Sequence, residues 1–126
     1  MSDKPVLTPD ASHPITVTPT SDRVVVTLVE RQIADTTSAL TLQEASYPAV
    51  QYVPLADVDP AVLERTDHAT YCPYKGDASY YSLVADGQTL DNAVWTYETP
   101  YDAVAEIAGH VAFYPNVVDV RTYPSS

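Results

Sequence analysis

The stretch from Ala78 to Tyr97, ASYYSLVADGQTLDNAVWTY, decides the fold class. Its first eight residues predict a strand over 78–85, with Tyr80 on one face and Tyr81 on the other. Asp86-Gly87 is typical of a tight hairpin turn. The chain then returns as a second strand over 93–97, so this stretch predicts an antiparallel β-hairpin.

Alternating apolar residues extend this pattern to most of the chain. They predict six further short strands, over 23–29, 31–35, 39–44, 49–53, 112–114 and 117–122. Because strands dominate and do not alternate with helices, the pattern argues against a doubly wound parallel sheet. The fold class expected is mainly β with two short helices, as a compact curved sheet or a barrel-like arrangement.

The two helices are predicted from their start signals. Asp59 is a favourable N-cap before Pro60, and the helix continues over 61–65. Thr99 caps the second helix and Pro100 takes its first position, with Gly109 at its end. The segment 66–76 lies between these helices and is expected to be irregular up to a turn at its end.

Length and charge bound the class of protein. The chain has 126 residues, a 45% hydrophobic content and a formal net charge of −11, from 17 acidic and 6 basic residues. The length fits one domain, expected over 21–124 after an extended, proline-containing arm over 1–20. The acidity argues against nucleic-acid partners and against docking on an anionic membrane, since both need clustered Lys and Arg.

Cysteine usage and hydropathy indicate the compartment. Cys72 is the single cysteine, so no internal disulfide can form. The N-terminal residues carry no apolar run typical of a signal peptide, and no stretch approaches the ~18 apolar residues of a transmembrane helix. A cytoplasmic protein is therefore expected.

Chemically versatile residues are densest over 65–76. Cys72 could serve as a nucleophile, with Lys75 or His68 lowering its pKa. The alternative is a buried thiol that behaves as a small apolar group. His68 and Cys72 are too few ligands for a closed metal site, so neither a metal nor another cofactor is expected.

Aromatic residues gather in the central half of the chain. Tyrosine combines a flat stacking surface with one polar tip, which suits small planar ligands and protein partners alike. The walls of a pocket are assigned to Tyr47, Tyr52, Tyr80 and Trp95, and its polar contacts to Thr66, His68, Tyr71 and Lys75. The alternative is ordinary packing within a β-sheet, where tyrosine is common.

Two motifs of nucleotide chemistry are weak or missing. Asp57 and Asp59 have the spacing that metal-dependent nucleotidyl transfer uses, but Asp59 directly precedes Pro60 and suits a helix cap. Three glycines spread over the chain cannot form a phosphate-binding loop.

The block Cys72-Pro73-Tyr74-Lys75-Gly76, followed by Ala78-Ser79-Tyr80-Tyr81, resembles a bacterial family of domains of unknown function, number 427, also labelled nucleotidyltransferase-like. The resemblance extends from about Val24 to Val120. Further matching segments are Ile33-Ala34-Asp35-Thr36, Tyr47-Pro48, Tyr52-Val53-Pro54, Ala93-Val94-Trp95-Thr96-Tyr97, Ile107-Ala108-Gly109, Phe113-Tyr114-Pro115 and Val118-Asp119-Val120.

The resemblance implies a β-rich fold of the Mss4-like kind. It does not imply zinc, because the cysteine pairs of zinc-binding relatives are absent here. Members often carry Arg-Glu-Gly where this chain has Gln43-Glu44-Ala45. The residues that nucleotidyl transfer requires are missing, so the family's label implies no such activity.

Two functions remain open from the sequence. The first is a domain that binds a small polar or anionic metabolite in a tyrosine-rich pocket, with catalysis by Cys72, Lys75 and His68 left open. The alternative is a non-catalytic protein-interaction or homodimerisation module, so the protein is expected to be a monomer or a homodimer. Lys75 is notable because residues 66–120 hold eight acidic residues and this one basic residue.

Overall fold

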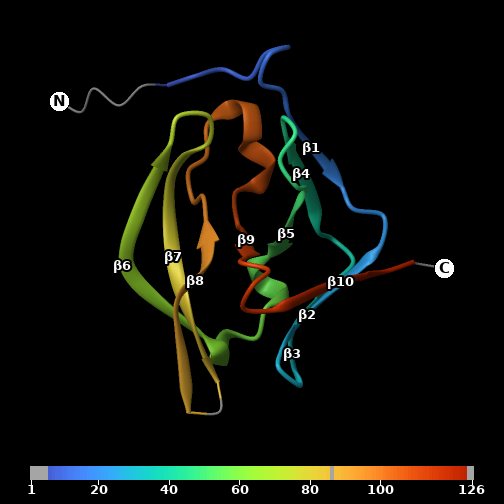
Figure 1. Ribbon diagram of the computed structural model, residues 1–126, viewed down its shortest axis with the longest axis vertical. Helices are drawn as coiled ribbons and strands as arrows, with labels where there is room; N and C mark the ends of the chain where they lie inside the picture. The colour runs from blue at the N-terminus through green and yellow to red at the C-terminus, as the bar shows by residue number, and fades with distance from the viewer. Residues whose placement is uncertain (1–5, 86, 125–126) are drawn as a thin grey trace.

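The computed structural model describes residues 6–85 and 87–124, which form ten strands in two antiparallel sheets (Figure 1). The strands are β1 (Ile15–Pro19), β2 (Arg23–Leu28), β3 (Arg31–Thr36), β4 (Leu40–Glu44), β5 (Val50–Pro54), β6 (Leu63–Cys72), β7 (Gly76–Ala85), β8 (Gln88–Thr96), β9 (His110–Phe113) and β10 (Asp119–Tyr123). One sheet has the order β1-β4-β5-β9-β8-β7-β6 and the other has the order β10-β2-β3.

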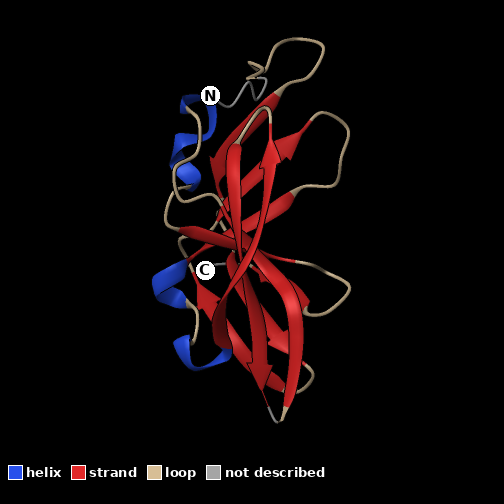
Figure 2. Ribbon diagram, turned by 90° about the vertical axis from the view of Figure 1, so that its left-hand side faces the viewer, coloured by secondary structure: helices blue, strands red, loops and turns tan. Residues whose placement is uncertain are grey.

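The mainly-β class predicted from the sequence is confirmed. The larger sheet is open, however, and within the described residues it is not a closed barrel, because β1 and β6 are its two unpaired edges. Three short 3₁₀ segments connect the strands: η1 (Leu55–Asp57), η2 (Pro60–Val62) and η3 (Asp102–Ile107). Figure 2 shows the helical segments along one side of the strands.

The predicted hairpin is present as β7 and β8. Ala85 pairs with Gln88, and Gly87 has a φ of 79°, a backbone conformation that glycine adopts without steric cost. Asp86, the other residue of the expected turn, lies outside the described residues.

The strict alternation of faces predicted for this hairpin is interrupted at one place. A register shift between Tyr81 and Leu83 lets both Tyr80 and Leu83 be buried, at 7% and 0% exposure. On β8, Asn92 adopts a φ of 52° and its backbone N–H donates to the Ser82 hydroxyl at 3.1 Å. A bulge of this kind bends a strand and increases its twist, so it helps to curve the sheet.

The segment expected to be irregular, 66–76, is mostly strand β6, which pairs with β7. The preceding helix is correspondingly shorter than predicted. Asp59 does cap it, accepting from the Ala61 N–H at 2.9 Å, but η2 ends at Val62 and Leu63 already belongs to β6. Pairing with β7 outweighs the weak local preference for helix there.

The second predicted helix is also shorter. Its N-cap is Tyr101 rather than Thr99, and it is the 3₁₀ segment η3. The predicted end is confirmed, since Gly109 follows with a φ of 78°. Val104 and Ile107 are fully buried, so burial of these two side chains holds η3 in place.

The last residues of the expected N-terminal arm form β1. This strand pairs with β4 over its whole length, from Ile15 opposite Glu44 to Pro19 opposite Leu40. The arm therefore enters the larger sheet as an edge strand.

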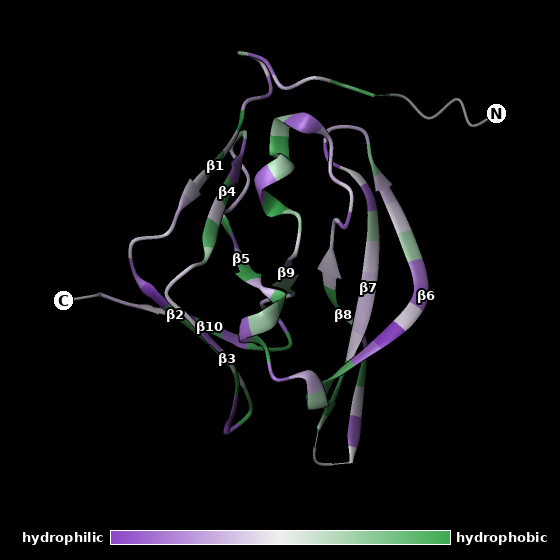
Figure 3. Cartoon of the chain, turned by 180° about the vertical axis from the view of Figure 1, so that it is seen from behind, coloured by the Kyte–Doolittle hydropathy of each residue, from purple (hydrophilic) through white to green (hydrophobic). Residues whose placement is uncertain are grey.

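Two clusters of buried side chains make the core. The first lies between the two sheets and includes Val24, Val53 and Val94. The second lies against η3 and includes Leu42, Tyr52 and Ile107. Figure 3 shows a hydrophobic stretch on β5 near the centre of the molecule.

The turn between β2 and β3 is strained. Val29 is the first of its two residues, has a φ of 57° and is 82% exposed. A left-handed conformation is unfavourable for a β-branched residue, and no packing compensates for it here. We expect Val29→Gly to raise the free energy of unfolding by about 0.5–1 kcal/mol in a denaturant titration.

The control for this change is Val29→Ala, which keeps the Cβ and should gain less. Equal or lower stability of Val29→Gly would contradict a strained turn.

Candidate functional site

A pocket of about 200 Å³ opens between β4, β5, the β6–β7 turn and the end of β8. It is lined by a carboxylate, an ammonium group and a ring of aromatic and apolar side chains. The lining residues are Leu42, Glu44, Tyr47, Pro48, Val50, Tyr52, Lys75, Tyr80, Trp95, Tyr97 and Tyr114.

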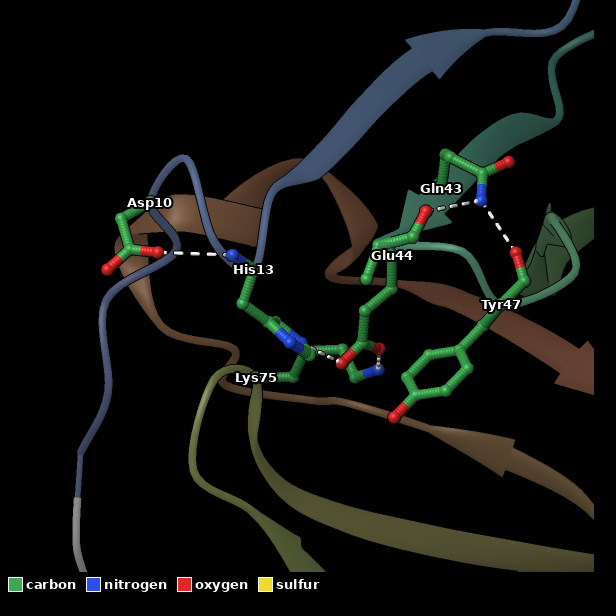
Figure 4. A network of polar contacts seen from close by, with 7 residues as sticks. Asp10, His13, Gln43, Glu44, Tyr47 and Lys75 are labelled. Atoms are coloured by element: carbon green, nitrogen blue, oxygen red, sulfur yellow. Dashed lines mark hydrogen bonds and ion pairs between the residues drawn. The ribbon is translucent and has the colours of Figure 1, made fainter.

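An ion pair lies in the wall of this pocket. Lys75 Nζ donates to Glu44 Oε1 at 2.6 Å, and the two side chains are only 12% and 14% exposed. His13 Nε2 contacts the other oxygen of the same carboxylate at 2.8 Å (Figure 4). The His13 ring also stacks on Tyr74, with centroids 4.2 Å apart. The carboxylate therefore joins β4, the residues before β1 and the β6–β7 turn.

Local backbone structure fixes Lys75 in this position. Its N–H donates to the Cys72 carbonyl, and its carbonyl accepts from Tyr101 N–H at 3.0 Å. Gly76 follows with a φ of 109°, where any other residue would be strained. The turn is thus held on both sides and directs Lys75 at Glu44.

Electrostatics favour the charged form of Glu44. Burial acts to raise the pKa of this carboxyl, but the hydrogen bonds from Lys75 and His13 outweigh burial and leave the pKa lowered. The ammonium charge of Lys75 is consequently neutralised within the protein. The sequence presented Lys75 as the lone cation of an acidic half, and the structure pairs it.

Tyr52 and Trp95 are in direct contact within the aromatic wall, where Tyr52 is buried and Trp95 is half-buried. Trp95 Nε1 donates to the Tyr52 hydroxyl at 3.1 Å, and the two rings meet edge to face at 6.4 Å. Burial raises the pKa of Tyr52 to about 12, so its hydroxyl is protonated and available as a donor at neutral pH.

Three more tyrosines of the wall have contacts of their own. The Tyr80 hydroxyl is hydrogen-bonded to Thr70 at 2.9 Å. Tyr97 is 7% exposed, its pKa is raised by burial, and Lys75 Nζ lies 5.8 Å from its ring centroid. Tyr114 packs against Trp95 at 4.6 Å and stands 38% exposed at the rim.

The structure brings together five of the predicted site residues. Those lining the pocket are Tyr47, Tyr52, Lys75, Tyr80 and Trp95. The remaining four do not line it: Thr66, His68, Tyr71 and Cys72.

Three of these four have contacts elsewhere. Thr66 donates to Asn92 Oδ1 at 2.7 Å across the bulged strands. The exposed His68 places its ring against Tyr80 at 4.5 Å, and Tyr71 shares a 2.6 Å hydrogen bond with the Tyr101 hydroxyl.

Cys72 packs partly buried against the second core cluster. Among the described residues its thiol has no hydrogen-bonded base that would activate it as a nucleophile.

Sequence reasoning missed Glu44, Tyr97, Tyr114 and His13 as parts of this site. Glu44 and Lys75 are 31 residues apart, as are His13 and Glu44, so no local motif connects them. Tyr97 did carry a signal, because it lies two residues after Trp95 in the predicted strand 93–97, and alternate residues of a strand share a face.

No group of three or more His, Cys, Asp or Glu side chains that could hold a metal ion occurs within the described residues. Asp59 caps η2, and Asp57 accepts from the Thr36 hydroxyl at 2.6 Å, so both aspartates of the DxD spacing have structural contacts. None of the described helices is long and apolar enough to span a membrane.

Comparison with known families identifies the chain. A family model described as a domain of unknown function (DUF427) matches residues 16–123, so the chain belongs to this family. A comparison with curated proteins finds no match. The matched range includes every residue that lines the pocket.

The ion pair generates a prediction about stability. Removing one partner of a buried pair leaves the other charge unpaired, whereas replacing both is often nearly neutral. Because this pair is partly buried, we expect Glu44→Gln alone to lower the free energy of unfolding by about 2 kcal/mol, and the double variant Glu44→Gln/Lys75→Met to recover most of that loss.

The matched control is the surface pair of Arg65 with Glu98, whose side chains are 50% and 51% exposed. Glu98→Gln should cost less than about 1 kcal/mol. If the double variant lost as much stability as Glu44→Gln and Lys75→Met lose separately when their losses are added, the result would contradict a coupled pair.

Proposed function

We propose that this protein binds a small, polar, uncharged molecule in the pocket beside Glu44 and Lys75. The observation that carries this proposal is a partly buried ion pair in the wall of an open pocket surrounded by tyrosines. Taking two charges out of water is costly, and a well-packed apolar pair is often at least as stable. A polar cluster at the edge of an open space is better explained by a ligand that uses it.

The size of the pocket limits the ligand. About 200 Å³ is smaller than the ~300–1,000 Å³ of sites for drug-sized molecules. A single planar ring or a short chain with a hydrogen-bonding head would fit against Trp95 and Tyr97. The tyrosine hydroxyls offer donors, and the Glu44 carboxylate offers an acceptor.

The charge balance favours an uncharged head. Lys75 is already paired with Glu44 at 2.6 Å, so an anion would have to compete with a carboxylate for the same ammonium group. This narrows the sequence-based expectation of a polar or anionic metabolite. We assign no reaction to the pocket, because Cys72 and His68 are not among the residues that line it.

The basic residues argue against a nucleic-acid partner. Each described Lys or Arg side chain forms an ion pair with a carboxylate, which leaves no free cluster for phosphates. These residues are Arg23, Arg31, Arg65, Lys75 and Arg121. We further propose a cytoplasmic location, on the single cysteine, and an Mss4-like fold, on the resemblance of the sequence.

Self-association is the second candidate function. Tyr47 and Tyr114 line the pocket and are 58% and 38% exposed, and exposed tyrosines are enriched at protein interfaces. A homodimer would cover these two rings with a second copy of the chain.

Thermal unfolding in the presence of small neutral planar probes tests ligand binding. We expect at least one of nicotinamide, benzamide and uracil to raise the melting temperature in a saturable way, since binding to the native state stabilises it. Tyr97→Phe removes a pocket hydroxyl and should weaken binding about fivefold.

The control is Tyr123→Phe, which removes a hydroxyl from an exposed tyrosine on β10 and should leave binding unchanged. No saturable shift with any probe, together with a dimer in light scattering, would favour the interaction module instead.

A further inference from the structure

A second cavity, of about 330 Å³, lies between the two sheets. Its walls come from β2 and β10 on one side and from β5, β8 and β9 on the other. The lining residues are mainly apolar: Val26, Pro48, Ala49, Val50, Gln51, Val53, Trp95, Phe113, Pro115, Val120 and Thr122.

This cavity is a groove that opens to solvent. Val26, Val53 and Phe113 are buried and form its floor, whereas Pro48, Ala49 and Pro115 are exposed at its rim. Gln51 is one of two polar residues in the walls, and its amide is hydrogen-bonded to Thr41 and Thr20. Apolar surface that stays open to water beside a polar pocket is typical of a binding groove, so it suits the apolar part of a ligand.

The cavity adjoins the pocket beside Glu44 and Lys75, which we call the tyrosine pocket. Three residues, Pro48, Val50 and Trp95, line both spaces. One face of this shared wall therefore meets Glu44 and Lys75, and the other meets valines and a phenylalanine.

We propose that the two spaces form one composite site for an amphipathic ligand, whose uncharged hydrogen-bonding head lies in the tyrosine pocket and whose apolar tail passes Trp95 into the inter-sheet cavity. This inference rests on the proposed function and adds the ligand class to it. The tail gains from burial of apolar surface, whereas the head gains from the tyrosine hydroxyls and the Glu44 carboxylate.

Trp95 provides a direct signal for both parts of the site, because it is the single tryptophan of the chain. The probes are primary aliphatic amides from butanamide to octanamide, which share one uncharged head and differ in tail length. Titrations of the full chain are followed by Trp95 fluorescence. We expect affinity to rise about fourfold for each added methylene until the cavity is filled.

Two variants separate tail from head. Ala49 is exposed and lines the inter-sheet cavity but not the tyrosine pocket. Ala49→Leu should therefore narrow the cavity without unfolding the protein. It should abolish most of the gain from tail length and leave butanamide binding unchanged. Ala61→Leu, at an exposed position outside both spaces, is the matched control and should behave as the wild type. Tyr97→Phe should weaken every amide by a similar factor.

The outcomes distinguish the two proposals. Binding of every amide with no dependence on tail length would overturn the composite site and leave the tyrosine pocket standing. Affinity that rises with tail length and falls in Ala49→Leu, but is unaffected by Tyr97→Phe, would overturn the head assignment and with it the proposed function. No saturable change of Trp95 fluorescence with any amide would overturn both.

Discussion

The contact on which the site depends is the ion pair between Glu44 and Lys75. In the larger sheet, β4 and β7 are separated by β5, β9 and β8, yet these two side chains meet at 2.6 Å. Such a contact requires the sheet to curve until its distant strands face each other. Side chains of β4, of the residues before β1 and of the β6–β7 turn are therefore in contact, and the tyrosine pocket is the concave space that this curvature encloses.

Curvature has an identifiable cause in the backbone. Register shifts interrupt the pairing of β6 with β7 and of β7 with β8. At these places Asn92 takes a left-handed conformation and Thr66 bonds to it across the strands. Bulges in neighbouring strands bend them together, which brings Lys75 at one end of β7 over towards Glu44. Residues predicted for the site thus serve it in different ways: Thr66 helps to shape the sheet, whereas Lys75 lies in the pocket.

The sequence predicted those features that depend on local patterns. Alternation identified the strands at residues 23–28 and 78–85, and Asp59 with Pro60 identified the start of η2. It missed β6, because this strand exists through pairing with β7 and has no clear alternation of its own. Half of the candidate site was predictable from clustered tyrosines and from Lys75. The other half was not predictable. Glu44 contacts Lys75 and His13 contacts Glu44, and the residues of each pair are 31 positions apart in the sequence.

The central claim is that the space beside Glu44, Lys75 and Trp95 is a ligand site. A crystal structure of the full chain purified from its own cells without refolding tests it most directly. The account predicts electron density for a small organic molecule in contact with Trp95 and Tyr97. A pocket covered instead by side chains of a second copy, in a preparation that is also dimeric in solution, would contradict it.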